Sequence, residues 1–185
     1  MAYIDLGLEE TRHPGITGLL AYRPETARPI EALVDALLVA PNSLARGERE
    51  LIAAYVSALN DCLFCRNAHS AFAAAQLDAG MPLIEQVCAD LDTAPLSPKL
   101  RALLRMAAAV QRNGQAVTPE LVNAARAEGA TDVEVHDTVL IASAFCMLNR
   151  YVDGLGTVAP SDPSRYQASV PRIVACGYST EDRGD

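Results

Sequence analysis

Apolar residues recur every three or four positions through most of the chain, which is the spacing of amphipathic α-helices. The first such segment runs from Glu25 to Leu38 and follows Pro24, a residue that suits the first position of a helix. Its apolar positions are Ile30, Leu33, Val34, Leu37 and Leu38. No segment alternates apolar and polar residues for long enough to predict a strand. We therefore expect an all-α fold, a helical bundle of one domain with no significant β-sheet.

Helix start and stop signals divide the rest of the chain. A second helix is expected to begin at Glu48. Asn60 and Asp61 are residue types that cap a helix N-terminus, so a third helix is expected after them, up to Gly80. These and similar signals predict helices over residues 48–59, 62–79, 82–91, 98–111, 118–129 and 131–152, with further N-caps at Ser97 and Thr131.

The last long helix, opened by a capping box of Thr131 and Glu134, is apolar on most of its circumference. Such a helix is usually buried, in the core or against a neighbouring subunit. Beyond Gly156 the composition changes to Ser, Pro, Asp and Arg, with one short apolar patch. We therefore divide the chain into a helical domain of residues 1–156 and a C-terminal arm or tail of residues 157–185. The arm is expected to dock on the same or another subunit and to end in disordered residues.

Length and hydropathy are those of a globular domain. The 185 residues are enough to bury a substantial core, and half of them are apolar. No uninterrupted apolar run approaches the roughly 18 residues that a membrane span needs, and the N-terminus has no basic patch followed by an apolar block. We therefore expect a cytoplasmic protein, in which a CxxC pair is more often redox-active or metal-binding than a structural disulfide.

The charge balance limits the partners. The chain has 23 acidic and 15 basic residues, a net charge of −8, and no cluster of Lys and Arg. It also lacks Trp and is poor in aromatic residues. A nucleic-acid-binding surface needs clustered positive charge or a platform of stacking aromatics. Neither nucleic acid nor a membrane is therefore expected as a partner.

Chemically reactive side chains are concentrated between Glu50 and His69. Cys62 and Cys65 are three positions apart, so in the first turn of a helix they share one face. Their Cα separation would then be about 5 Å, within the range that a disulfide spans. His69 follows Cys65 by one helical turn, and Glu50 lies on the preceding helix. The two cysteines can therefore form and break a bond without refolding.

A redox-active cysteine has to be acidified, because a free thiol with a pKa of about 8.5 is only a few per cent thiolate at neutral pH. Lowering that pKa by about 1.5 units requires about 2 kcal/mol of preference for the anion. A helix N-terminus supplies about 0.3–1 kcal/mol, and at most about 2. We therefore expect His69 to take the proton of Cys65, and Glu50 to orient the imidazole or relay the proton onward.

The order Glu50, eleven intervening residues, Cys62-Leu-Phe-Cys65, three further residues and His69 resembles the active-site signature of a known family. That family is the AhpD-like (alkylhydroperoxidase D-like) branch of the carboxymuconolactone decarboxylase superfamily. Phe64 stands inside the CxxC, where the well-studied AhpD enzymes carry a second histidine and many peroxidase-related members carry an aromatic residue. Other features similar to the peroxidase-related subgroup are GLLAYRPETA (Gly18–Ala27), Arg49-Glu50, Leu59-Asn60 and Asn149-Arg150.

The resemblance covers most of the chain and implies an all-helical fold, a homo-oligomer such as a trimer or hexamer, and no cofactor or metal. It also implies reduction of a small-molecule hydroperoxide. In the family pattern Cys65 becomes the sulfenic acid and Cys62 resolves it, while His69 and Glu50 relay protons. An external dithiol or reductase system then resets the disulfide. We therefore predict a thiol-dependent peroxidase with Cys65, Cys62, His69 and Glu50 as catalytic residues.

Three alternatives stay open. The same cysteine pair would serve a disulfide reductase or redox adaptor that does not turn over peroxide. Lactone decarboxylation is carried on the same superfamily fold, by enzymes that generally lack the CxxC. A structural zinc-binding oligomer would use both cysteines with His69 as third ligand and His136 or Cys146 as fourth.

The remaining candidates have a structural interpretation. The other three cysteines are isolated and are predicted to pack in the core as small apolar residues: Cys88, Cys146 and Cys176. Three polar residues near the end of the last long helix are predicted to stabilise a helix end or an interface: Asn149, Arg150 and Asp153.

Overall fold

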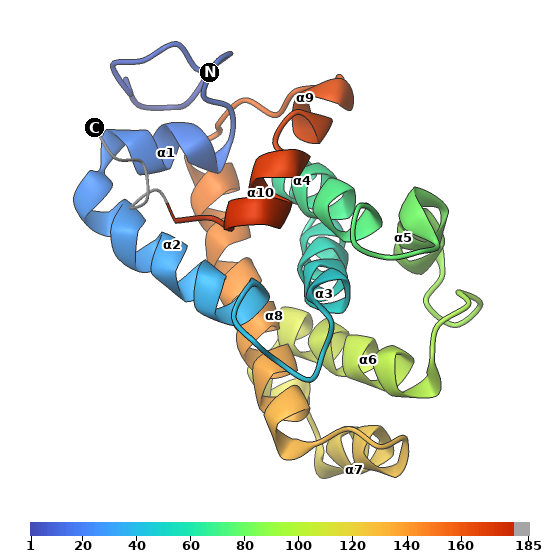
Figure 1. Cartoon of the computed structure of the whole chain (residues 1–185). Helices are drawn as coiled ribbons and strands as arrows, with labels where there is room; N and C mark the ends of the chain where they lie inside the picture. Colours follow the sequence, from blue (N-terminus) through green and yellow to red (C-terminus); the bar gives the residue numbers. More distant parts are fainter. Residues whose placement is uncertain (180–185) are drawn as a thin grey trace.

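The computed structural model describes residues 1–179, and within this range the chain consists of helices and connecting turns with no strand (Figure 1). This confirms the all-α fold. The helices are α1 (Ile16–Tyr22), α2 (Pro24–Leu38), α3 (Arg46–Leu59), α4 (Leu63–Ala74), α5 (Gly80–Ala89), α6 (Pro98–Arg112), α7 (Pro119–Ala127), α8 (Asp132–Gly154), α9 (Ser164–Gln167) and α10 (Val170–Cys176), with a 3₁₀ turn η1 (Gly114–Ala116). No helix in this range combines the length and the apolar character of a membrane span. The cytoplasmic location stays a prediction.

Two helix starts follow the capping signals in the sequence. The Ser97 hydroxyl accepts a hydrogen bond from the backbone N–H of Leu100 at 3.2 Å, and Pro98 takes the first position of α6. At α8 the Thr131 hydroxyl accepts from the N–H of Glu134 at 3.2 Å. The Glu134 carboxylate accepts in return from the N–H of Thr131 at 2.8 Å. Both predicted N-termini are therefore confirmed.

Two segments differ from the prediction. Residues Ile16–Tyr22, for which no helix was predicted, form α1. The third predicted helix ends at Ala74 rather than Ala79, and Gly80 begins α5 instead of ending α4. The intervening residues favour a helix locally, but the chain turns there so that α5 folds back and buries Val87 beside α3 and α4. Tertiary packing outweighs local propensity at this point.

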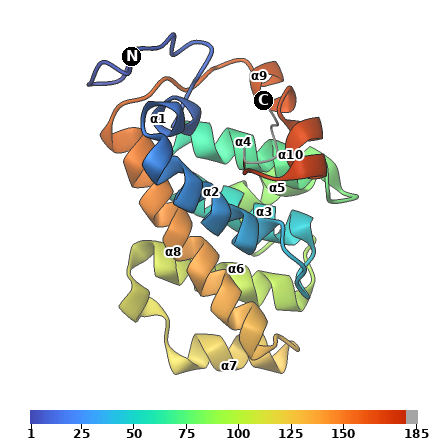
Figure 2. The same ribbon diagram turned by 60° about the vertical axis from the view of Figure 1, so that its left-hand side comes forward.

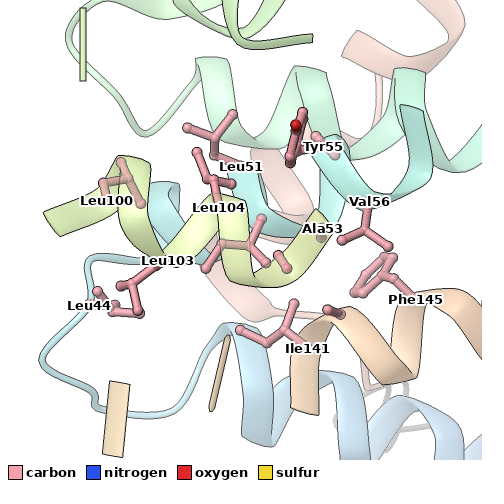
Figure 3. Packing of buried hydrophobic residues seen from close by; sticks show 14 of the residues in the cluster. Leu44, Leu51, Ala53, Tyr55, Val56, Leu100, Leu103, Leu104, Ile141 and Phe145 are labelled. Atoms are coloured by element: carbon pink, nitrogen blue, oxygen red, sulfur yellow. The ribbon is translucent and has the colours of Figure 1, made fainter. Parts of the chain in front are cut away.

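The centre of the bundle is α3, against which α2, α4, α5, α6 and α8 pack. Its side chains without exposed surface include Leu51, Ile52, Ala53, Ala54 and Val56. Figure 3 shows the side chains of α3 in one apolar cluster with Leu103 and Leu104 of α6 and with Ile141 and Phe145 of α8. Because α3 is surrounded by other helices, its polar residue Glu50 is buried as well, at 0% exposure.

Arg49, the neighbour of Glu50, joins two helices from inside the core. It is 2% exposed and donates from Nη1 to the backbone carbonyl of Leu37 at 2.8 Å, at the end of α2. Burial and the charge of Arg46 lower the pKa of Arg49, while the charges of Asp137 and Glu50 raise it. Arg49 therefore anchors α2 to α3 and places a cation near the buried glutamate.

The C-terminal arm folds back over the helical domain of its own chain. Figures 1 and 2 both show α9 and α10 beside α4, and both helices contact it. Tyr166 of α9 and Ile173 of α10 are buried, at 6% and 2% exposure. They belong to a second apolar cluster that contains Cys62, Phe64 and Cys65. The arm thus covers the helix that carries the cysteines.

The structure does not test two of the expectations about the arm. Its division from the helical domain at Gly156 stays a prediction. The disorder expected for the last residues falls on 180–185, which lie outside the residues that the structure describes.

Candidate active site

The turn between α3 and α4 places the first cysteine. Asp61 has a left-handed φ of 56°, and its N–H donates to the carbonyl of Ala58 at 3.0 Å. The N–H of Cys62 donates to the carbonyl of Ser57, also at 3.0 Å. These bonds form a Schellman motif that ends α3. The N-cap of α4 is therefore Cys62, and the prediction that Asn60 and Asp61 cap this helix is wrong, because both residues are used to close the preceding one.

Both thiols are buried in their reduced form. Cys62 is 0% exposed and Cys65 is 3% exposed, and both are free cysteines. Their side chains are in hydrogen-bonding contact across the first turn of α4. The structure thus brings the two predicted cysteines together.

Phe64, between the two cysteines in the sequence, contacts both the N-terminal segment and the C-terminal arm. Its ring lies so close to Gly15 that a Cβ there would be 2.2 Å from Phe64 Cγ, and Gly15 also has a φ of 58°. On the other side, the rings of Phe64 and Tyr166 have centroids 5.7 Å apart. Glycine is therefore required at position 15, and the aromatic residue closes the site by contacting the N-terminal segment and the arm.

The contact between the thiols controls their acidity. The hydrogen bond with Cys62 and burial raise the pKa of Cys65 well above its usual value, and charge on Cys62 acts in the same direction. A hydrogen bond from Asn149 lowers this pKa, and the charge of Asp153 raises it. The acidification expected for Cys65 is therefore absent from the reduced pair.

Glu50 of α3 and His69 of α4, the helix that begins at Cys62, form a buried pair. Glu50 Oε2 lies 2.7 Å from His69 Nδ1, and His69 is 8% exposed. The edges of Phe72 and Phe145 meet the imidazole, with ring centroids 5.5 Å and 4.5 Å away. An unpaired carboxylate at this depth would be strongly unfavourable, so its bond with the imidazole is what allows its burial.

This pairing determines which nitrogen of His69 is the base. The Glu50 carboxylate accepts from Nδ1–H, which leaves Nε2 without a proton in the neutral ring. Among residues 1–179, no side chain bonds Nε2 and no hydrogen bond joins His69 to Cys62 or Cys65. A proton that moves between sulfur and imidazole therefore has to pass through a group that comes between them.

Asn149 is a site residue to which the sequence analysis gave only a structural role. It is 1% exposed, and its Nδ2 donates to Ser57 Oγ at 3.0 Å. Its Oδ1 accepts from Asn60 Nδ2 at 2.8 Å. Asn149 therefore links α8 to the end of α3 while also bonding Cys65. In the sequence, the only sign of a role at the site was the Asn149-Arg150 pair, which is similar to the peroxidase-related subgroup.

Tyr178 is a second site residue that the sequence analysis missed. Its hydroxyl donates to Glu50 Oε1 at 2.6 Å, and it lies beyond α10 in the polar C-terminal segment. No spacing or residue pattern around it signals a contact with Glu50, because the contact depends on how the arm docks.

A hollow of about 440 Å³ lies beside α4, within the size range of small-molecule sites. Its lining includes Arg66, Asn67, Ser70, Cys88 and Tyr166. Burial raises the pKa of Tyr166, and the charges of Cys65 and Cys62 raise it further. Tyr166 therefore lies close to both thiols as well as to the hollow.

The ligands that a zinc site would need do not converge. Within residues 1–179, no group of three or more His, Cys, Asp or Glu side chains could hold a metal ion. His136 is exposed and bonds the neighbouring Asp137 at 2.8 Å, while Cys146 accepts from Asn60 at 3.7 Å. The zinc alternative therefore finds no ligand set in this part of the chain.

Fold and site together define a class of all-helical proteins in which a cysteine pair and a carboxylate–imidazole pair share two adjacent helices. The sequence profile of the Carboxymuconolactone decarboxylase family matches residues 24–80, a stretch that contains all four predicted catalytic residues. No curated protein sequence matches the chain significantly.

Two solved structures are similar over most of the chain. The first is an alkylhydroperoxidase AhpD core, an uncharacterized peroxidase-related protein from Ralstonia eutropha JMP134, with 30% identity, a TM-score of 0.75, and coverage of 83% of this chain and 79% of that chain. The second is an uncharacterized peroxidase-related protein from Silicibacter sp. TM1040, with 26% identity, a TM-score of 0.75, and coverage of 83% and 78%. The chain therefore belongs to the AhpD-like branch of the carboxymuconolactone decarboxylase superfamily.

Proposed function

We propose that the protein is a thiol-dependent peroxidase, an alkylhydroperoxidase-like antioxidant enzyme that reduces hydroperoxides through Cys62 and Cys65. The observation that carries the proposal is the 2.7 Å bond between Glu50 and His69, buried one helical turn beyond two thiols in contact. A carboxylate–imidazole pair of this kind is suited to proton transfer at a nearby nucleophile. The peroxidase-related names of both similar structures support the same class of activity.

In the proposed reaction the Cys65 thiolate attacks the terminal oxygen of a hydroperoxide, R–O–OH. The S–O bond forms as the O–O bond breaks, R–O⁻ takes up a proton and leaves as the alcohol, and Cys65 becomes a sulfenic acid. The Cys62 thiolate then attacks the sulfenic sulfur, a disulfide forms, and the hydroxyl leaves with a proton as water. An external dithiol or reductase system supplies the two electrons and two protons that restore both thiols.

His69 and Glu50 supply the proton transfers of this scheme. Nε2 of His69 takes the thiol proton and returns it to the leaving alkoxide, while Glu50 orients the ring and stabilises the imidazolium. No hydrogen bond joins His69 to Cys62 or Cys65 within residues 1–179, so in this scheme the hydroperoxide itself or a water molecule passes the proton between sulfur and imidazole. Asn149, as a donor to Cys65, favours the thiolate that attacks.

The cysteine assignments are tested by consumption of an alkyl hydroperoxide with a dithiol as reductant. Cys65→Ser is expected to abolish consumption, because serine is not nucleophilic enough to break the O–O bond. Without the dithiol, Cys62→Ser is expected to consume a single equivalent of hydroperoxide and to stop at the sulfenic acid of Cys65, whereas the wild type stops at the disulfide. Cys176 is exposed, so the prediction that it lies in the core is wrong, and Cys176→Ser is expected to turn over like the wild type. Wild-type turnover by Cys65→Ser would reject the assignment.

The same experiment separates the proposal from a disulfide reductase or redox adaptor. Rates are compared for an alkyl hydroperoxide and for a disulfide substrate coupled to the same dithiol. A peroxidase is expected to act on the hydroperoxide much faster than on the disulfide. Turnover of the disulfide alone would assign the cysteine pair to the reductase alternative.

A further inference from the structure

Tyr178 brings a hydroxyl from the C-terminal segment into the Glu50–His69 pair. Its hydroxyl oxygen lies 2.6 Å from Glu50 Oε1 and 3.4 Å from His69 Nδ1. Its ring is stacked on the imidazole, with centroids 5.9 Å apart and an interplanar angle of 23°. Each carboxylate oxygen therefore has its own donor: Tyr178 bonds Oε1, and His69 bonds Oε2.

The backbone around Tyr178 is anchored in the position that this contact requires. Asp35 of α2 accepts from the N–H of Tyr178 at 2.7 Å and from that of Ser179 at 2.8 Å. Gly177 has a φ of 77°, and a Cβ at this position would lie 2.5 Å from Asp35 Oδ1. Arg46 of α3 donates to two backbone carbonyls of α10, at 2.8 Å and 3.1 Å. The segment is thus held by α2 and α3 independently of the tyrosine hydroxyl.

The electrostatic surroundings keep this hydroxyl protonated. Burial, and then the charge and hydrogen bond of Glu50, raise the pKa of Tyr178 well above its usual value. The charge of Arg46 lowers this pKa and that of Asp35 raises it. The charged and titratable groups facing the Glu50 carboxylate and the hydroxyl are Asp35 on α2, Arg46 and Arg49 on α3, and His69 on α4, whereas α8 presents the ring of Phe145.

We propose that Tyr178 is a positioning residue of this site: its hydroxyl fixes the orientation of the Glu50 carboxylate, so that Oε2 accepts from Nδ1–H of His69 and Nε2 is left as the base. The catalytic meaning of this role rests on the proposed peroxidase function. A carboxylate with no exposed surface depends on donated hydrogen bonds from the protein, and Tyr178 supplies one of them. The arm therefore takes part in the proton relay as well as covering the cysteines.

Tyr178→Phe tests this role, because it keeps the stacked ring and removes only the hydroxyl. Glu50 then has one donor fewer, and its bond to His69 Nδ1 is no longer fixed from the Oε1 side. The kcat for peroxide consumption is expected to fall about tenfold with KM unchanged. Tyr55→Phe, which removes a hydroxyl from a buried tyrosine of the main core, is expected to keep the wild-type kcat.

A second readout does not depend on turnover. The ¹⁵N NMR signals of the His69 ring nitrogens in the reduced protein report which nitrogen of the neutral ring carries the proton, and in Tyr178→Phe this proton is expected to be shared between Nδ1 and Nε2 instead of being held at Nδ1. If the variant loses thermal stability but keeps the wild-type tautomer, Tyr178 is a packing residue and the proposal is overturned. If neither the wild type nor the variant consumes peroxide while the tautomer changes, the positioning role holds and the proposed function fails.

Discussion

Glu50 has no exposed surface, and its position depends on partners from two distant parts of the chain. Its register with the cysteines and with His69 was enough to predict it as a site residue, although an isolated helix glutamate is usually solvated. The second donor could not be predicted, because Tyr178 is 128 residues away and reaches Glu50 only through the docking of the arm. The sequence thus predicts the residues on adjacent helices, and tertiary packing adds the others.

The acidity of the thiols is where reasoning about single residues was wrong. A helix N-terminus and a neighbouring imidazole favour one thiolate, and both features are present around Cys65. The structure adds burial and a second thiol in contact, and both raise the pKa of Cys65. The spacing predicts the second thiol beside the first but not the burial, which depends on Phe64, Tyr166 and the arm covering the pair.

The raised pKa of Cys65 makes the stability of the reduced protein depend on pH. The folded protein holds the thiol proton more tightly than the unfolded chain, so this stabilisation is complete below the unfolded pKa of about 8.5 and is lost as pH rises toward the folded pKa. The melting temperature of the reduced wild type is therefore expected to fall more steeply between about pH 8 and pH 10 than that of Cys65→Ser, measured by circular dichroism with a phosphine reductant.

Comparison of the two slopes isolates Cys65 from other groups. Cys88 and Tyr178 also have raised pKa values, but they contribute equally to both proteins. Parallel melting curves for wild type and Cys65→Ser over this pH range would contradict a raised pKa for Cys65.

Among the helices, the prediction succeeded where one capping residue serves one helix. Ser97 and Thr131 cap α6 and α8 as expected. An extended Ser or Thr directly before a helix accepts hydrogen bonds from the N–H groups of its first turn. Asn60 and Asp61 were ambiguous, since both residue types also tolerate the end of a helix and the left-handed region. The structure uses them to end α3, which is what places Cys62 at the start of α4.

Asp61 is the residue on which this turn depends. Its φ of 56° is tolerated by Asp and Gly but opposed by a β-branched side chain. Asp61→Val is therefore expected to lower the free energy of unfolding by about 1–2 kcal/mol, while Asp61→Gly is expected to leave it unchanged or slightly increased. Urea denaturation of the reduced proteins measures both values. Equal stabilities for the valine and glycine variants would show that the left-handed conformation is not required.

At the scale of the whole molecule, α8 has apolar residues on a face that the rest of the described chain does not cover. Val133, Leu140 and Met147 recur every seven residues and therefore lie on one face of the helix. They are 60%, 37% and 49% exposed. Exposed apolar side chains that share one face of a helix commonly mark an association surface. The sequence analysis expected this helix to be buried in the core or against another subunit, and this face is the part that the core leaves uncovered.

The homo-oligomer implied by the resemblance stays a prediction, and this face allows a direct test. The wild type is expected to have the mass of a trimer or hexamer of the 19.7 kDa chain in size-exclusion chromatography with light scattering. Leu140→Glu would bury an unpaired charge in the interface and is expected to release monomers. Tyr22→Glu places the same charge on an exposed residue of α1 and is expected to leave the mass unchanged. A monomeric wild type, or an oligomer indifferent to Leu140→Glu, would assign the exposed face no role in assembly.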